Sequence, residues 1–311
     1  MKTYERLFDL LSQSSDYISG EKLAQDLGIS RTSIWKAIQR LEKEGLEIDS
    51  LKNRGYRLTS GDLLIPEKIE EIAPITVSIN PHCQSTQLDA KAGIEANQAS
   101  NHLYLASSQS AGRGRFGRDF YSPKQGGFYM SLHLRPNLPF DQVPAYTLLT
   151  AGAIYQAIKN LTLIDVDIKW VNDIYYQNKK IAGILTEATS SIETGLVTDL
   201  IIGVGFNFCI SDFPDQIKDK AGSLFKQNPP ISRNELIGEI WKCFYQLPSD
   251  QLIYLYKKRS LVLNRQVRFL KNQENYQGLA KEISDKGQLL IQLADGQEIW
   301  LASGEVSLQS W

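Results

Sequence analysis

The sequence predicts an α+β protein of three domains: a winged helix-turn-helix at the N-terminus, a central mixed α/β sheet covered by helices, and a small C-terminal β-barrel of the SH3 type. Three observations lead to this prediction. Apolar residues recur at helical spacing up to Gly45, strand and helix patterns then alternate, and five short strand-like segments end the chain. We expect the domains to span residues 1–63, 64–264 and 265–311.

The composition is that of an ordinary globular protein. Of the 311 residues, 42% are hydrophobic and 22% charged, and the formal net charge is -1. This balance excludes a generally basic nucleic-acid binder, so any DNA contact must come from a local patch. The cysteines Cys83, Cys209 and Cys243 are widely spaced, which argues against a disulfide framework and a zinc site. We expect a cytoplasmic protein with no signal peptide and no membrane span, because no apolar run approaches ~18 residues.

The first domain contains a helix-turn-helix pattern. Ser19 is placed to cap a helix that Gly28 ends, and Ser30 to cap a helix that ends at Gly45. In this motif the second helix enters the major groove, with its N-terminal residues nearest the bases. The expected DNA contacts on this helix are Arg31, Thr32, Ser33 and Lys36.

A β-hairpin is expected after this helix, because residues 46–58 alternate around an Asn-Arg-Gly turn. The hairpin forms the wing of a winged helix, and Lys52, Arg54 and Arg57 give it positive charge. From Arg31 to Arg57, seven Lys or Arg residues stand against four Asp or Glu residues. The alternative is a helical bundle used only for protein contacts, but charge, turn and wing together favour DNA binding.

The middle of the chain predicts the mixed sheet and its helices. Residues 61–74 have the composition of a linker with a short helix. Beyond them, strands are expected at 102–107, 126–136, 167–176, 179–188 and 200–208, and helices at 144–161 and 232–247. The second helix opens on a capping box formed by Ser232 and Glu235. From about Asn264, short strands separated by turns indicate the small barrel.

The segment GRGRFGR, Gly112 to Arg118, is the best candidate for chemistry, since the sequence has no HExxH or GxxxxGK[ST] motif and no GxGxxG that opens a helix. Its glycines let the backbone approach a ligand closely, and its arginines match phosphate or carboxylate oxygens. A disordered nucleic-acid-binding tract and a solvated turn are the alternatives. Flanking strands argue against the first, and three cations without balancing acids argue against the second.

A second group of polar residues lies in KWVND and KKIAG. A hairpin between these segments would bring Lys180 near Asp173. An aspartate beside cations can hold a metal or orient a nucleophile, and a lysine can neutralise charge that builds on a phosphoryl group. A surface ion pair is the alternative.

GRGRFGR, KWVND, KKIAGIL, IIGVGFNF and SGEVSL, in this order, resemble the biotin–protein ligases. With the N-terminal winged helix, essentially the whole chain is similar to the bifunctional kind, which joins a biotin ligase to a biotin operon repressor. The resemblance implies a catalytic domain like that of class II aminoacyl-tRNA synthetases. It also implies formation of biotinyl-5′-adenylate from biotin and ATP with Mg²⁺, then transfer of biotin to a lysine of a carboxylase's biotin carrier domain.

The resemblance also implies roles for individual residues. Catalysis is assigned to Lys180, Arg115 and Asp173, with Asp173 also as the metal ligand. Biotin binding is assigned to Ser85, Thr86, Gln109, Gly112, Arg113, Arg115, Lys180, Gly183 and Gly203. Binding of ATP or the adenylate is assigned to Arg118, Phe120, Asn172, Asn207 and Gly205.

Four positions depart from the family pattern. Gln87 stands where the family has Asn, Phe120 where Trp is common, Val171 where KWPND has Pro, and Gln309 where an Arg often stands. None removes a catalytic cation, but together they bear on nucleotide affinity.

The expected function is therefore an active ligase that also represses transcription as a homodimer on two-fold operator DNA. Two alternatives remain: a biotin-sensing regulator with weak catalysis, and a lipoate-type ligase.

Overall fold

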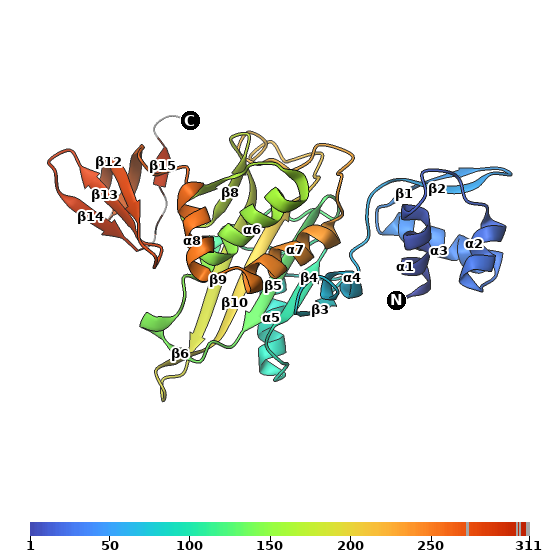
Figure 1. Ribbon diagram of the computed structural model, residues 1–311, viewed down its shortest axis with the longest axis horizontal. Helices are drawn as coiled ribbons and strands as arrows, with labels where there is room; N and C mark the ends of the chain where they lie inside the picture. Colours follow the sequence, from blue (N-terminus) through green and yellow to red (C-terminus); the bar gives the residue numbers. More distant parts are fainter. Residues whose placement is uncertain (272–273, 303, 305, 309–311) are drawn as a thin grey trace.

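The computed structural model describes residues 1–271, 274–302, 304 and 306–308. Three units lie in a row along the long axis of the molecule, with the N-terminal unit at one end, the main sheet in the centre and a small sheet at the other end (Figure 1). This arrangement agrees with the three-domain expectation, although the boundaries after residues 63 and 264 stay a prediction. Gln309 lies outside the described residues.

The N-terminal unit has the expected winged helix-turn-helix order. Its elements are α1 (Thr3–Ser12), α2 (Gly20–Leu27), α3 (Arg31–Lys43), β1 (Glu47–Leu51) and β2 (Gly55–Ser60). The Ser19 and Ser30 side chains accept hydrogen bonds from the Lys22 and Ser33 backbone N–H groups, and each cap contributes about 1 kcal/mol. Gly28 ends α2 in the left-handed conformation, with φ of 66°. The predicted caps and the predicted glycine stop are confirmed.

A clamp of hydrogen bonds joins the winged helix to the central unit. The Arg233 guanidinium, 7% exposed, donates from Nη2 to the Asp62 carbonyl over 2.8 Å and from Nη1 to the Gly127 carbonyl over 2.8 Å. Asn234 donates to the Leu63 carbonyl and accepts from the Ile65 N–H. These contacts fix the linker to the first turn of helix α7 (Arg233–Gln246).

The central unit is built on one mixed sheet. Its strands are β3 (Thr76–Ile79), β4 (His102–Ala106), β5 (Gly127–Leu134), β6 (Leu138–Pro139), β7 (Asp167–Lys169), β8 (Asp173–Tyr176), β9 (Lys179–Ser190) and β10 (Leu196–Asn207). The spatial order is β3-β4-β5-β10-β9-β8-β7, with β6 pairing beside β10. The β3–β4 pair is parallel and the other pairs are antiparallel. Strand β10 is central, as its apolar sequence predicts.

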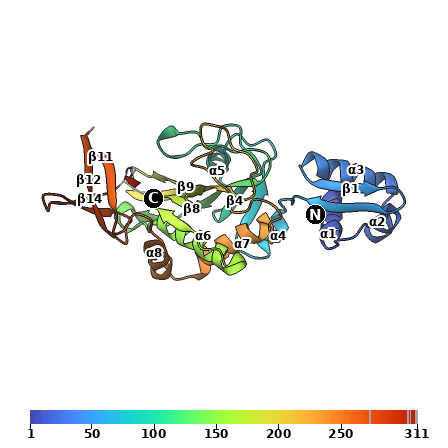
Figure 2. The ribbon, with the colours of Figure 1, turned by 90° about the horizontal axis from the view of Figure 1, so that it is seen from above.

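Helices cover both faces of this sheet. They are α4 (Pro66–Glu70), α5 (Thr86–Glu95), α6 (Tyr146–Thr162), α7 (Arg233–Gln246) and α8 (Ser249–Lys258), with the 3₁₀ turns η1 (Arg115–Gly117) and η2 (Phe140–Gln142). Figure 2 shows α5 on one side of the sheet and α6, α7 and α8 on the other. Helix α6 is buried almost all round because it packs between the sheet and its neighbours, and a Cβ on its Gly152 would lie 2.4 Å from the Leu252 carbonyl oxygen of α8.

The C-terminal unit is an antiparallel sheet of short strands. They are β11 (Gln266–Lys271), β12 (Glu274–Ile283), β13 (Leu289–Leu293), β14 (Glu298–Leu301) and β15 (Val306–Leu308), in the order β14-β13-β12-β11-β15. The five predicted strands are confirmed. Among the described residues, no pairing joins β14 to β15, so the ladder that would close an SH3-type barrel is not seen there. Trp170 Nε1 donates to the Gly287 carbonyl over 2.9 Å and links this unit to the centre.

Three local expectations need correction. The strand expected at 167–176 is two strands, because the chain turns between Lys169 and Asp173 and β7 pairs back onto β8. The helix expected from Pro144 begins at Tyr146. Helices α5 and α8 were not expected; the buried side of α5 is small or polar, so it carries little of the apolar periodicity that marks a helix.

Candidate active site

A cavity of about 170 Å³ opens on the sheet face that carries α5. It is lined by Ser85, Thr86, Gln87, Gln109, Arg113, Gly114, Arg115, Arg118, Asp119, Phe120, Met130, Asn172, Asp173, Lys180, Gly183, Ile184, Leu185, Gly203, Val204 and Gly205. These residues come from segments far apart in the sequence: the start of α5, the loop before β5, and strands β5, β8, β9 and β10. The fold therefore brings almost all of the predicted ligase residues to one place.

Glycines form the floor of the cavity. Gly203 and Gly205 alternate along β10 and point to one face, and Gly183 of β9 lies opposite Gly205 in the register. The space above them is already used, because a Cβ on Gly205 would lie 2.4 Å from Phe120 Cε1 and one on Gly203 would lie 3.1 Å from Gln87 Cδ. A side chain at position 205 would therefore collide with the Phe120 ring, whereas one at position 203 would press against Gln87.

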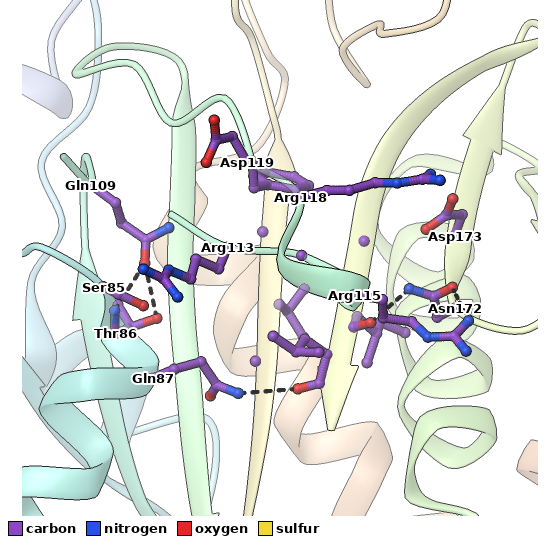
Figure 3. A pocket seen from close by; sticks show the side chains of 18 of the residues that line it. Ser85, Thr86, Gln87, Gln109, Arg113, Arg115, Arg118, Asp119, Asn172 and Asp173 are labelled. Carbon is purple, nitrogen blue, oxygen red and sulfur yellow. Dashed lines mark hydrogen bonds between the residues drawn. The ribbon is translucent and has the colours of Figure 1, made fainter. Parts of the chain in front are cut away.

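The GRGRFGR loop closes on itself beside this floor. The Gly114 N–H donates to the Arg118 carbonyl over 2.7 Å, and the Phe120 N–H donates to the Gly112 carbonyl over 2.9 Å. Phe116 and Gly117 take positive φ values of 58° and 72°, which turns the chain at the tip of the loop. Figure 3 shows Arg113, Arg115 and Arg118 around the cavity that this loop borders.

Arg115 is held by hydrogen bonds to two segments outside the loop. Its Nη1 donates to Asn172 Oδ1 and to the Gly304 carbonyl, both over 3.3 Å. Asn172 is itself fixed, since its Nδ2 donates to the Ile184 carbonyl over 2.8 Å. The KWVND turn thus orients a cation of the loop, and the carbonyl of Gly304 brings the C-terminal unit to the edge of the site.

Lys180 and Asp173 form an ion pair of 2.7 Å at the same end of the cavity. The Lys180 ammonium also lies 5.8 Å from the centre of the Phe120 ring. Four cationic side chains, counting those of Arg113, Arg115 and Arg118, therefore line the cavity against two carboxylates, Asp119 and Asp173. This local excess suits an anionic ligand.

The opposite end is formed by a chain of hydrogen-bonded polar groups. The Thr86 N–H donates to Gln109 Oε1 over 2.8 Å, and Ser131 Oγ donates to Thr86 Oγ1 over 2.8 Å. Gln109 Nε2 completes the chain by donating to Ser122 Oγ over 3.1 Å. Between the two ends lie the glycine floor and Leu185, whereas Met130, Ile184 and Val204, which alternate with the glycines, belong to the core on the other face of the sheet. A ligand with a hydrogen-bonding head and an anionic end matches this order.

Two predicted site residues lie outside the lining. Gly112 is behind the cavity, where a Cβ would lie 2.6 Å from Ser122 Oγ and 2.8 Å from Gln109 Nε2. Asn207 is buried at the end of β10, where its Nδ2 donates to the Gly222 carbonyl over 3.0 Å. Both support neighbouring segments in this structure.

Gln87 lines the cavity, although it was noted only as a departure from the family pattern. Its Nε2 donates to Glu187 Oε2 over 3.0 Å, while its Oε1 is buried without a hydrogen-bond partner among the described residues. Its place one residue after Thr86, in the first turn of α5, is the signal that could have indicated it.

The donor set for Mg²⁺ is small. The described residues contain no group of three or more His, Cys, Asp or Glu side chains able to hold a metal. Mg²⁺ commonly needs only one or two carboxylates when nucleotide phosphates and waters supply the rest. The cavity lining contains two carboxylates, Asp119 and Asp173, which is within that number.

The predicted DNA-binding residues lie on the N-terminal unit, away from the cavity. Arg31, Thr32 and Lys36 are exposed and Ser33 is half-buried on α3, and Lys52 and Arg54 are exposed at the wing turn. The wing is held against the α1–α2 connection, because Arg54 and Arg57 lie 4.7 and 4.6 Å from the Tyr17 ring centre. Recognition helix and wing therefore form a fixed unit.

Comparison with known proteins identifies the family to which the chain belongs. Residues 82–207 match the model of the Biotin/lipoate A/B protein ligase family, residues 5–57 an HTH domain, and residues 262–309 the Biotin protein ligase C terminal domain. The chain is 36% identical over 307 residues to the Bifunctional ligase/repressor BirA of Bacillus spizizenii, covering 93% of this chain and 94% of that one. The chain belongs to the biotin–protein ligase family. The corresponding protein of Escherichia coli is 28% identical over 322 residues, covering 98% of this chain and 97% of that one.

A solved structure of the family shares the fold. The biotin protein ligase from Aquifex aeolicus, described in complex with biotin and ATP, superposes with a TM-score of 0.61 at 28% identity. The superposition covers 75% of the present chain and 98% of the Aquifex chain, so the present chain has residues that the Aquifex chain lacks. Within the described part of the chain, no helix is long and apolar enough to cross a bilayer.

Proposed function

We propose that the protein forms biotinyl-5′-adenylate from biotin and ATP and transfers the biotin to a lysine of a carboxylase's biotin carrier domain. The observation that carries the proposal is the convergence of Arg113, Arg115, Arg118 and Lys180 on a glycine-floored cavity that also contains the hydrogen-bonded Thr86–Gln109 group. The Thr86–Gln109 end suits the ureido ring of biotin, the glycine floor leaves room for its aliphatic chain, and the cations suit its carboxylate.

In the first step, a biotin carboxylate oxygen attacks the α-phosphorus of ATP, a new P–O bond forms, and pyrophosphate leaves with the electrons of the broken bond. Both reactants are anionic, so their approach needs cations that offset the repulsion and hold an in-line geometry. Lys180 and Arg115 are assigned this role, since developing phosphoryl charge is stabilised by donors already in place. Asp173 orients Lys180 and is the expected protein ligand of the Mg²⁺ that accompanies ATP.

In the second step, the neutral amine of the acceptor lysine attacks the acyl carbon of the mixed anhydride. An amide bond forms, the amine loses its proton, and AMP leaves. This step needs positioning and no covalent intermediate with the enzyme. Arg113, Arg115 and Arg118 on the loop would retain the adenylate until the carrier domain arrives.

Biotin-dependent pyrophosphate exchange into ATP tests the ligase. Exchange with biotin and none without it is expected, whereas exchange that lipoic acid supports equally well would favour a lipoate-type ligase. If folded wild-type protein catalysed no pyrophosphate exchange, the ligase proposal would be wrong and the protein would be a biotin-sensing regulator.

We also propose that the protein represses transcription as a homodimer whose two winged helices bind two-fold operator DNA in the cytoplasm. Support comes from the exposed cations of α3 and the wing, and from the relatives described as bifunctional ligase and repressor. Arg31→Ala and Lys36→Ala should each weaken DNA binding, by about tenfold if one charge-assisted contact is lost, with unchanged pyrophosphate exchange. Identical association in sedimentation with and without biotin plus ATP would contradict a ligand-dependent dimer.

A further inference from the structure

A large aromatic side chain is exposed in the first half of α3, the helix expected to enter the major groove. Trp35 is 51% exposed, although its neighbours Ile34, Ala37 and Ile38 on the same helix are buried in the winged-helix core. An exposed tryptophan leaves much of its apolar ring in water, so the side chain contributes only part of its area to folding. Helix α3 is already stabilised by its buried apolar residues and by the Ser30 cap.

Trp35 lies among polar and cationic residues on the outer face of α3. The exposed positions Arg31, Thr32, Trp35, Lys36 and Gln39 follow the spacing that places side chains on one face of a helix. Between Arg31 and Arg40 the sequence contains no carboxylate. The indole is therefore bordered by two cations and has an amide one turn further on.

The charge around Trp35 favours nucleic acid over the protein's own central unit as its partner. Helix α3 is tied to that unit at its other end, where Lys124 Nζ donates to the Lys43 carbonyl over 2.7 Å. The half of α3 that carries Trp35 points its cations outward, as do Lys52 and Arg54 on the wing. A polyanion complements this surface, and phosphates bound by the cations would bring the indole against base edges.

We propose that Trp35 is a specificity-determining residue that reads thymine methyl groups in the major groove. The thymine C5-methyl is the apolar group that base pairs present there, and apolar side chains select it by contact. Removing that methyl and the apolar ring from water together favours sites with thymine at the contacted position. This inference rests on the operator binding proposed above and adds the residue and the base group that supply part of its specificity.

The test begins with the full-length protein, biotin, ATP and a randomised DNA duplex library, from which binding sites are selected. A selected site is then synthesised with deoxyuridine in place of thymidine, one position at a time, which deletes one methyl group and keeps the base pairing. Wild-type affinity should fall by ~fourfold for each methyl group that Trp35 contacts, the factor that corresponds to burial of one methylene-sized group. Trp35→Ala and Trp35→Gln should bind thymidine and deoxyuridine versions of that site equally.

Trp300→Ala is the matched control, because Trp300 is 44% exposed on β14 in the C-terminal unit. It should keep the wild-type deoxyuridine penalty. Folding of each variant is checked by circular dichroism and by biotin-dependent pyrophosphate exchange, to which Trp35 makes no contribution in this scheme.

Two results would overturn the inference while leaving operator binding intact: the same deoxyuridine penalty in Trp35→Ala as in wild type, or no penalty in wild type at any position. If Trp35→Ala instead lowers self-association measured without DNA, and keeps the penalty, the indole belongs to a protein interface. A wild-type protein that selects no site overturns the repressor role and this inference together, and pyrophosphate exchange then reports separately on the ligase.

Discussion

Lys180 Nζ lies 2.7 Å from Asp173 Oδ1, across the pair of strands β8 and β9. The contact depends on an irregularity in that pair, because the register shifts between Ile174, which pairs with Ala182, and Tyr175, which pairs with Lys180. Strict alternation would place Lys180 and Gly183, three residues apart, on opposite faces of the sheet. The bulge turns both toward the cavity, where the lysine meets the carboxylate.

The first prediction concerns this lysine. Lys180→Ala should slow biotin-dependent pyrophosphate exchange by roughly 10²- to 10³-fold, the loss typical of removing a positioned donor to developing charge. Lys179→Ala is the control, since the Lys179 ammonium donates to the Lys218 carbonyl outside the cavity lining. Equal losses in the two variants would show that charge near the β9 start matters and that the position of Lys180 does not.

The second prediction concerns retention of the adenylate. Arg115→Ala removes the cation held by Asn172 and Gly304, so biotinyl-5′-adenylate should dissociate ~10- to 100-fold faster, as expected for loss of a charge-assisted hydrogen bond. Stopped-flow release of prebound adenylate measures the rate. Arg135→Ala, whose arginine is bound to Asp199, should release it at the wild-type rate. An unchanged dissociation rate in Arg115→Ala would show that Arg115 does not retain the adenylate.

The third prediction concerns the cavity floor. In Gly205→Ala the new Cβ would meet the Phe120 ring, so the variant should lose about 1–3 kcal/mol of folding free energy and bind ATP more weakly. Introduced into Phe120→Ala, the same change should cost much less, because the two residues are coupled. Gly114→Ala, whose Cβ would have no neighbour closer than 3.7 Å, should change stability little. Additive effects of Gly205→Ala and Phe120→Ala in urea unfolding would contradict the contact.

The fourth prediction concerns the thiols. Burial, with Asp89 and Glu239 nearby, raises the pKa of Cys83 and of Cys243 to about 12. At pH 8 these thiols should resist alkylation in the native protein and react readily once it is unfolded, because the thiolate is the nucleophile. Cys209, half-buried, should react before them. Mass spectrometry of timed iodoacetamide reactions measures the order, and early labelling of Cys83 would contradict its burial.

The same shift has a defined sign for stability. Unfolded cysteines lose their protons near pH 8.5, whereas these buried thiols keep theirs to higher pH. Their contribution to the free energy of unfolding is therefore complete below about pH 8 and is lost as the pH rises through the interval between the unfolded and folded pKa values. Denaturation curves of wild type and Cys83→Ser, compared across this range, report the difference.

Much of the architecture could be predicted because it depends on local patterns. Helix caps, glycine stops and strand alternation each reflect interactions within a few residues. Examples are the caps Ser19, Ser30 and Ser232, the Gly28 stop and the alternation along β5 and β10. Helix α5 escaped prediction because its buried side is formed by polar and small residues such as Thr86 and Gly93, which are buried for the site and for close packing.

The sequence by itself determined the order of the three units, the winged helix and the family resemblance, and it predicted that GRGRFGR binds an anion. Only the tertiary structure decided that Phe120 lies over Gly205, that Asn172 and Gly304 hold Arg115, and that a bulge turns Lys180 toward Asp173. The physical reason is distance along the chain. Capping and alternation act within a few residues, whereas the cavity brings together segments between Ser85 and Gly205, and their meeting depends on strand register, on a bulge and on packing.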